Sequence, residues 1–328
     1  MTNSKPNTKP IAITMGDPAG IGPEIIAMLY RDHAAAMQGT VVYGDTAVMR
    51  RACELVGIPS EAIQVIQAGD PFDTDSLPPY GRVSGAAGLA AAKAVEAAAH
   101  ATFRGDARAI VTAPLHKEAL ALAGIAHPGH TEMLQALCAG PQGLPPVRMM
   151  LANDELRTVL VSIHVPLREA LDSLSIKGIL ETIQVTHDFL VSTGIKNPRI
   201  AVAGINPHAG EGGLFGREEI DIIAPAVEAA KALGIRASGP FSPDTIFMRA
   251  KKTAVQDEFD VVIAMYHDQG LIPVKYLGLD AGVNVTLGLP MIRTSPDHGT
   301  AFDMAGTKKA DPRGLLYALQ KAREFAGV

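Results

Sequence analysis

The sequence predicts an α/β protein in which helices cover both faces of a mainly parallel sheet. Short apolar runs rich in Val and Ile recur along the chain, and few of them alternate with polar residues. Continuous apolar runs are typical of parallel strands that are buried on both faces. Helical patterns lie between these runs, which is the order expected of an α/β fold. With 328 residues and 47% hydrophobic content, the chain is long enough for two joined subdomains.

The predicted strands share a feature at their ends, because Gly, Pro, Asn or His follows each apolar run directly or after one residue. Such residues end a strand and begin a turn. In chain order the predicted strands are 11–15, 40–43, 109–112, 147–151, 158–163, 200–203, 261–265 and 283–287.

The clearest predicted helices alternate with these strands. Ser175 is a suitable N-cap for the second of them, and Gly194 and Gly234 provide stop signals after the second and third. A stretch rich in Pro, Asp and Gly, 69–81, is predicted as a loop. The predicted helices are 85–102, 175–193, 217–233 and 314–325.

Composition excludes several classes of protein. The formal net charge is -5, aromatic residues make up 5% and Trp is absent, so neither an electrostatic nor a stacking surface for nucleic acid is expected. Cys53 and Cys138 are isolated, which suits reduced thiols. The N-terminal segment is polar, and no run approaches the roughly 20 apolar residues that span a bilayer. We expect a cytoplasmic protein without nucleic-acid or membrane partners.

Three histidines follow three predicted strands. His164 follows 158–163, His208 lies in GINPHAGEGG after 200–203, and His267 follows 261–265. Ligands of parallel sheets lie outside the carboxyl ends of the strands, so these imidazoles are expected at one edge. A single histidine in such a place is more often a hydrogen-bonding residue. Three of them predict a divalent metal site with open positions for a ligand.

A second group of residues is cationic and polar. Lys275 follows the HDQG segment, Asn284 lies in a predicted strand, and Arg293 follows GLPMI. His130 and Thr131 lie in PGHTEML, where Thr131 is a candidate helix cap. Lys and Arg beside apolar, glycine-rich backbone suit a small phosphorylated anion. The alternative is that each is an ordinary solvated side chain.

Two segments rich in small residues are candidate loops around a nucleotide. The first, TMGDPAGIGPEII, follows a strand and opens a helix, but it is neither GxGxxG nor a Walker loop, so a structural turn is equally consistent. The second, 297–314, contains the loop HGTAFDMAG. Small residues allow close backbone approach to a nucleotide, and a helix cap would explain them equally well.

The chain resembles the 4-hydroxythreonine-4-phosphate dehydrogenase family. The motifs that carry the resemblance are MGDPAGIGPE, TAPLHKEAL, GHTEML, GINPHAGEGGLFGREEI, PDTIF, MYHDQGLIPVK, GVNVTLGLPMIRTSPDHGTAFDMAG and KADP, in order along nearly the whole chain. Two of the loops also resemble those of the isocitrate and isopropylmalate dehydrogenases, where the second loop holds the adenine end of NAD. The resemblance therefore implies that two-subdomain fold, with one subdomain from 1–130 and 290–328 and the other from 131–289.

The resemblance also implies an oxidative decarboxylating dehydrogenase of pyridoxal phosphate synthesis. It would use NAD or NADP and one divalent metal (Zn, Mg, Mn or Co), and it would work as a homodimer whose active sites lie at the interface. Metal ligands would be His164, His208 and His267. Substrate contacts would come from His130, Thr131, Lys275, Asn284 and Arg293, and cofactor contacts from His298, Gly299, Thr300, Asp303 and Gly306.

Two questions stay open at the level of sequence. The first candidate for the general base is Lys117 in TAPLHKE, and Asp244 and Asp268 are the alternatives. The resemblance implies 4-phosphohydroxy-L-threonine as the substrate, oxidised at C3 and decarboxylated to 3-amino-2-oxopropyl phosphate. The alternative that it implies is a sugar-acid phosphate, 4-phospho-D-threonate or 4-phospho-D-erythronate. Two other classes, a metal-dependent hydrolase and a protein that senses a phosphorylated metabolite without turnover, also fit the histidines or the cations taken alone.

Overall fold

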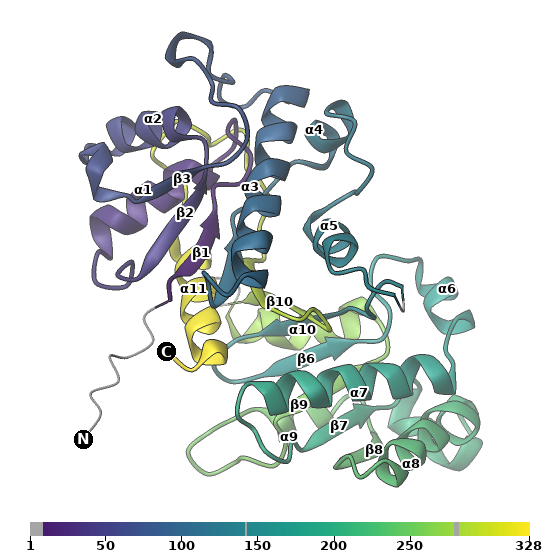
Figure 1. The fold of residues 1–328 in the computed structure, drawn as a ribbon. Helices are drawn as coiled ribbons and strands as arrows, with labels where there is room; N and C mark the ends of the chain where they lie inside the picture. The colour runs from purple at the N-terminus through teal and green to yellow at the C-terminus, as the bar shows by residue number, and fades with distance from the viewer. Residues whose placement is uncertain (1–8, 142, 279–281) are drawn as a thin grey trace. The chain divides into compact units, whose positions relative to one another are not determined.

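The chain divides into two compact units (Figure 1). The computed structural model describes residues 9–141, 143–278 and 282–328. The first unit is formed by the chain up to residue 145 together with 289–326, and the second by 146–288. The boundary expected after residue 130 falls inside the first unit, at the start of helix α5.

The first unit contains a parallel sheet in the order β3-β2-β1-β4-β11. Its strands are β1 (Ile11–Thr14), β2 (Thr40–Gly44), β3 (Val65–Gln67), β4 (Ala109–Thr112) and β11 (Ile292–Pro296). Its helices are α1 (Gly22–Asp32), α2 (Thr46–Val56), α3 (Gly85–Phe103), α4 (Lys117–Leu122), α5 (His130–Leu137) and α11 (Arg313–Ala326), with 3-10 turns at Ser60–Ala62 and Thr74–Ser76.

The alanine-rich helix α3 covers one face of this sheet (Figure 1). Its buried residues, including Ala92 and Val95, form one cluster with Ala12 and Ile110 of the strands. The small side chains let backbones approach closely, and a Cβ at Gly88 would lie 2.0 Å from the Ala119 carbonyl oxygen of α4. Helix α11 packs on β11 and β4. The sheet is therefore covered as its apolar strands predict.

The second unit contains a mixed sheet in the order β10-β5-β6-β9-β7-β8. Strands β6, β9, β7 and β8 are parallel, whereas β5 is antiparallel to both of its neighbours. The strands are β5 (Arg148–Ala152), β6 (Arg157–Leu160), β7 (Ile200–Ala203), β8 (Ala237–Phe241), β9 (Val261–Ala264) and β10 (Val283–Leu287).

Helices cover both faces of the second sheet. Residues of α9 (Ile246–Ala250) and α10 (His267–Leu277) form a core cluster with the strands, and Figure 1 shows α7 (Ile176–Ser192) on the opposite face. The remaining helical segments are α6 (Leu167–Asp172), a 3-10 segment at Pro207–Gly213, a π-turn at Glu219–Ile223 and α8 (Ala224–Ala232).

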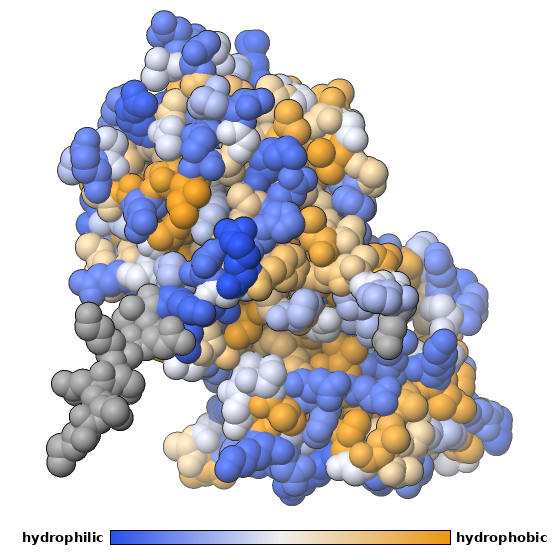
Figure 2. All heavy atoms as spheres, viewed as in Figure 1, coloured by the Kyte–Doolittle hydropathy of each residue, from blue (hydrophilic) through white to orange (hydrophobic). Residues whose placement is uncertain are grey.

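The surface of both units mixes polar and apolar residues. On the face of the molecule shown in Figure 2, hydrophilic and apolar residues are interspersed over the helices. Scattered apolar residues of this kind are normal for a globular surface. Among the described residues, no helix is both long and apolar enough to cross a bilayer.

The α/β class and all eight predicted strands are confirmed, but three further strands were not predicted. β3 has only three residues and is partly exposed, so its apolar signal is weak. β8 contains Gly239 and Pro240, residues that are unfavourable in strands. β11 reads Ile-Arg-Thr-Ser-Pro, and its polar residues are nonetheless buried. The N-cap prediction for Ser175 is confirmed, since its hydroxyl accepts from the Gly178 amide at 3.2 Å.

Candidate active site

One edge of the second sheet collects the predicted histidines. Because β6, β9 and β7 are adjacent and parallel, their carboxyl ends lie at the same edge. His164 follows β6, His267 is the first residue of α10 after β9, and His208 follows β7. Strand β8 is parallel to β7, and the exposed Asp244 follows it.

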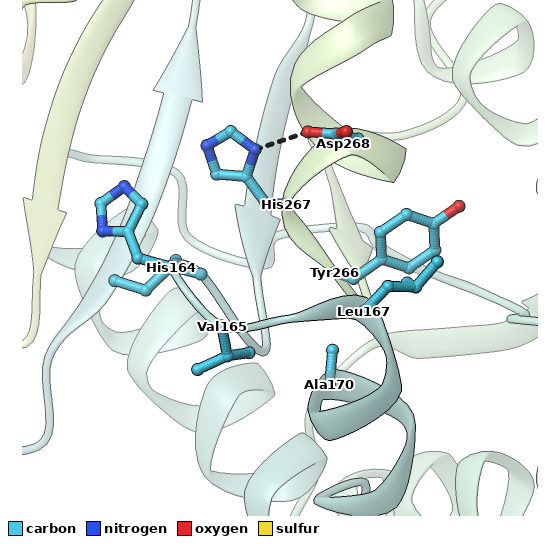
Figure 3. Close-up of a pocket in the computed structure, with 8 residues that line it drawn as sticks. His164, Val165, Leu167, Ala170, Tyr266, His267 and Asp268 are labelled. Carbon is cyan, nitrogen blue, oxygen red and sulfur yellow. Dashed lines mark hydrogen bonds and ion pairs between the residues drawn. The ribbon is translucent and has the colours of Figure 1, made fainter.

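His164 and His267 lie beside one another. Their ring centroids are 5.7 Å apart and the rings are inclined by 44°. Both line a cavity of about 250 Å³, and Figure 3 shows the two imidazoles side by side, His164 on the segment after β6 and His267 at the start of α10. The rest of the lining is mostly apolar: Ile163, Val165, Leu167, Ala170 and Tyr266, with Asp268. Two imidazoles at this separation can both contact one bound ion or molecule.

His267 has a carboxylate partner. Its Nδ1 lies 2.7 Å from an oxygen of Asp268, as the dashed line in Figure 3 marks. This pairing leaves Nε2 of His267 facing away from the carboxylate. A metal-binding histidine almost always has such an outer partner, which fixes its tautomer and orientation. The His267–Asp268 pair therefore has the form of a ligand with its orienting carboxylate.

The loop that carries His208 has an unusual backbone. Residues 208 to 213 all have positive φ, among them His208 at 53°, Ala209 at 55° and Glu211 at 42°. Left-handed backbone costs roughly 1–2 kcal/mol for each non-glycine residue. The side chain of His208 is 62% exposed, and its Nδ1 lies 3.2 Å from Glu211. The strained loop thus presents an imidazole to solvent.

A buried carboxylate holds this loop. Glu219 is only 2% exposed, and one of its oxygens accepts hydrogen bonds from the Ile205 and Asn206 amides, each at 2.7 Å. Its other oxygen accepts from Asn206 Nδ2 at 2.9 Å. Burial by itself would raise the pKa of Glu219, but these hydrogen bonds outweigh it and lower the pKa. The ionised carboxylate is therefore the stable form, and it anchors the loop.

The single chain brings two of the three predicted ligands together. Among the described residues, no group of three His, Cys, Asp or Glu side chains is placed to hold a metal ion. His208 is not part of the cavity that His164 and His267 line. A site with all three histidines would need a His208 from outside this chain.

In the first unit, the buried Arg293 and the half-buried His130 belong to one polar cluster. The guanidinium of Arg293 donates to the Thr112 hydroxyl through Nε at 3.1 Å and Nη2 at 2.7 Å. Burial lowers the pKa of Arg293 to about 10, and the Glu132 carboxylate opposes this shift. Burial and the charge of Arg293 lower the pKa of His130 well below its usual value. At neutral pH the cluster therefore holds a cationic arginine and a neutral imidazole.

The other predicted substrate and base residues are in different positions. Thr131 does not cap α5, because the N-cap residue is Gly129 and Thr131 lies inside the first turn. Lys117 is exposed at the start of α4. In the second unit, Lys275 lies in the last turn of α10, and Asn284 is half-buried on β10.

The two loops rich in small residues contact one another in the first unit. The Ile21 amide donates to the Thr300 carbonyl at 3.0 Å, and the Gly306 amide donates to Glu24 at 2.7 Å. The first loop is buried throughout, which favours the structural interpretation of its glycines. In the second loop, Thr300 is buried and Gly306 half-buried, whereas His298, Gly299 and Asp303 are exposed. The second loop therefore keeps a solvent-facing side.

Sequence reasoning missed three polar residues that shape these groups. They are Thr112, which pairs with Arg293, Glu219, which holds the His208 loop, and Gln269, which lies between two of the histidine loops. Gln269 belongs to the HDQG segment that contains His267. Its place beside His267 in the sequence could have identified Gln269 as a candidate. Thr112 and Glu219 have contacts that only the tertiary structure reveals.

Comparison with known proteins gives a consistent result. The family model described as "Pyridoxal phosphate biosynthetic protein PdxA" matches residues 36–322. The chain is 50% identical to 4-hydroxythreonine-4-phosphate dehydrogenase of Beijerinckia indica subsp. indica, over 95% of this chain and 94% of that protein. It is 44% identical to D-threonate 4-phosphate dehydrogenase of Pectobacterium atrosepticum, over 97% and 100%.

A solved structure is similar over the same extent. The crystal structure of 4-hydroxythreonine-4-phosphate dehydrogenase from Klebsiella pneumoniae has a TM-score of 0.87 and 43% identity. The match covers 97% of this chain and 99% of that one. Both the sequence and the fold are thus shared over nearly the whole length.

Proposed function

Because the chain belongs to the PdxA family of dehydrogenases, we propose that it oxidises 4-phosphohydroxy-L-threonine at C3 in pyridoxal phosphate synthesis. The C3 hydrogen leaves as hydride to NAD or NADP, and the hydroxyl proton passes to a base. The resulting β-keto acid loses carbon dioxide and gives 3-amino-2-oxopropyl phosphate.

The observation that carries this proposal is the pair formed by His164 and His267, with Asp268 behind His267. Imidazole nitrogen suits zinc and other first-row divalent metals, and the orienting carboxylate is typical of such a ligand. A bound divalent metal would supply Lewis-acid polarisation of the substrate hydroxyl. The two histidines would hold it.

We assign the third ligand position to His208 of a second copy of the chain. Within one chain His208 does not join the other two, yet its imidazole is exposed on a loop that is firmly held. Apolar side chains near the histidines are also exposed, with Leu167 at 56%, Leu214 at 73% and Phe215 at 48%. Exposed apolar residues grouped around a site are typical of an interface. A homodimer would cover them and complete the metal site.

The charged ends of the substrate call for cationic and hydrogen-bonding partners. Arg293 stays protonated at neutral pH, and His130 and Thr131 lie near the start of α5 in the same unit. His130, Thr131 and Arg293 are the proposed substrate contacts of the first unit, and Lys275 and Asn284 are those of the second. Arginine is the residue best suited to two-point recognition of such anions.

The cofactor is assigned to the loop from His298 to Gly306. NAD or NADP would accept the hydride when bound. His298, Gly299 and Asp303 are exposed and available for contacts, while Thr300 and Gly306 are tied to the buried first loop. This backing would hold the cofactor loop in one position.

Lys117 is our first candidate for the general base, and Asp244 is the second. Asp268, the third candidate, is hydrogen-bonded to His267 and is better placed to orient it. Lys117→Met should lower turnover by at least about 100-fold at saturating substrate, as expected for loss of a general base. Wild-type turnover in that variant would rule out this assignment.

The alternative substrate is 4-phospho-D-threonate or 4-phospho-D-erythronate. A relative that is 44% identical over nearly the full chain is named D-threonate 4-phosphate dehydrogenase. These substrates carry a hydroxyl at the position where the first substrate carries its amine, and the same histidines and cations would serve both classes.

The experiment is to follow NADH formation with 4-phosphohydroxy-L-threonine and 4-phospho-D-threonate side by side, with divalent metal and then with chelator. We expect chelator-sensitive turnover and a preference for the amine-bearing substrate. Preference for the threonate would move the protein to sugar-acid catabolism. No NADH with either substrate would favour a hydrolase or a metabolite-binding protein instead.

A further inference from the structure

A chain of hydrogen bonds joins the three loops that carry the histidines. The Ser162 hydroxyl donates to the Met265 carbonyl at 2.9 Å, which links the loop of His164 to that of His267. The Met265 amide donates to Oε1 of Gln269 at 2.6 Å, and Nε2 of Gln269 donates to the Gly204 carbonyl at 2.7 Å. Gly204 is the first residue after β7 and leads into the loop of His208. Gln269 is therefore the direct bridge between two of the histidine loops.

Half of this arrangement has a purely structural explanation. Gln269 is the third residue of α10, and Tyr266 is the N-cap. A Gln at the third position of a helix commonly reaches back to an amide before the helix, as in a capping box. The bond from the Met265 amide is of this kind, although it comes from the residue before the N-cap.

The other half is not explained by capping. The side-chain amide of Gln269 donates its hydrogen bond to the Gly204 carbonyl, which lies after a different strand, β7. Directly beyond Gly204, the Ile205 and Asn206 amides are fixed by Glu219. A Cβ at Gly204 would lie 3.0 Å from that carboxylate, so the backbone has little room to move. The side chain of Gln269 thus joins the start of α10 to a rigid loop base.

We propose that Gln269 is a positioning residue for the metal site, which sets the spacing between the loop of His267 and the loop of His208. It would not contact the metal or the substrate. In each chain it would hold His208 in a fixed relation to the pair formed by His164 and His267. Both sites of a dimer would then receive their third imidazole in the same geometry.

This inference rests on the metal site of the proposed function. It adds a residue, Gln269, that does not itself bind the metal. Outer partners of metal ligands typically contribute 10–100-fold to metal affinity, because they fix the ligand before the metal arrives. Removing Gln269 would release both loops at once. The expected loss of affinity lies in that range.

The test is the affinity for Co²⁺, measured by competition with a chromophoric chelator, in the full-length protein and in Gln269→Met. Methionine keeps the length of the side chain and removes both hydrogen bonds. The matched control is Gln256→Met in the same unit, where Nε2 donates to the Met248 and Arg249 carbonyls at 2.9 and 2.7 Å, away from the histidine loops. Thermal unfolding of the metal-free proteins shows whether the two variants lose similar stability.

We expect Gln269→Met to bind Co²⁺ about 10–100-fold more weakly and to change the visible absorption of the bound metal, while Gln256→Met binds as wild type does. Equal affinity and spectra in the two variants would overturn the inference while leaving the metal site intact. Failure of the wild type and the control to bind Co²⁺ would instead overturn the metal site itself, and the inference with it.

A second variant separates bridging from capping. Gln269→Glu keeps an acceptor for the Met265 amide and suits a helix N-terminus, but it places a carboxylate against the Gly204 carbonyl. We expect weaker Co²⁺ binding despite the added negative charge. Binding as tight as that of the wild type, or tighter, would assign Gln269 to the cap and overturn the bridge.

Discussion

Two glycine-rich loops follow parallel strands in this protein, and the packing around their glycines differs. The loop after β1 is buried throughout, and its glycines let backbones meet: a Cβ at Gly16 would lie 2.4 Å from the Pro114 carbonyl oxygen. The loop after β7 is largely exposed, and a Cβ at Gly212 would meet nothing within 4 Å. In the second loop glycine serves the left-handed backbone, which turns His208 outward.

Their buried carboxylates differ in the same way. Burial raises the pKa of Asp17 in the first loop, and its hydrogen bond from the Ala19 amide offsets this only in part. In Glu219, below the second loop, hydrogen bonds outweigh burial and lower the pKa. Burial disfavours the ionised form of Asp17 in the first loop. The second loop, in contrast, is held by the ionised form of Glu219. A run of glycines therefore identifies neither a binding loop nor a structural turn until its packing is known.

The largest effect on stability is expected at Gly16. Its φ is 75°, so Gly16→Ala adds left-handed strain as well as a clash with Pro114. Strain of roughly 1–2 kcal/mol and overpacking of roughly 1–3 kcal/mol together predict a loss of about 3 kcal/mol in the free energy of unfolding. Urea unfolding measures it. A loss below about 1 kcal/mol would mean that the close approach is easily relieved.

Glu219→Gln should have an intermediate and pH-dependent effect. The amide cannot accept all the hydrogen bonds that the carboxylate accepts, so we expect a loss of about 2 kcal/mol at pH 7. Because the folded pKa of Glu219 is below its usual value of 4.5, the stabilisation is fully present above that pH and is lost as the pH falls through the folded pKa.

The measurement compares the unfolding free energies of wild type and Glu219→Gln at pH 7 and below pH 4.5, where the gap should narrow. Glu218→Gln is the neighbouring control, since Glu218 accepts one hydrogen bond, from Asn206 Nδ2. A gap that stays constant with pH would show that the charge of Glu219 is not what holds the loop.

The smallest effect is expected at Gly212. Its φ is 66°, similar to that of Gly16, but there is open space around it. Gly212→Ala therefore adds only the strain of roughly 1–2 kcal/mol, without the overpacking, and we predict a loss of about 1 kcal/mol in urea unfolding. Losses of equal size in Gly212→Ala and Gly16→Ala would remove the distinction between the two loops.

Much of the fold could be predicted from the sequence, because continuous apolar runs report burial on both faces directly. The shared edge of His164, His208 and His267 followed from the parallel order of their strands, which the structure confirms. Strand β11 escaped prediction because its buried residues are polar and rely on tertiary partners such as Thr112 for Arg293.

The left-handed path of the His208 loop could not be predicted either. Three of its residues with positive φ are not glycine, so local preference argues against that path. Glu219, eleven positions further along the chain, overrides this preference by binding the amides at the base of the loop.

The exposed loop presents His208, which we propose as a metal ligand. Elemental analysis of bound metal in wild type and His208→Ala tests this role, with His187→Ala on α7 as a histidine control. We predict about one divalent metal per chain in wild type and His187→Ala. His208→Ala should lose most of its metal, since loss of a direct ligand costs more than the 10–100-fold of an outer partner, and its circular dichroism should be unchanged. Full metal content in His208→Ala would contradict the three-histidine site.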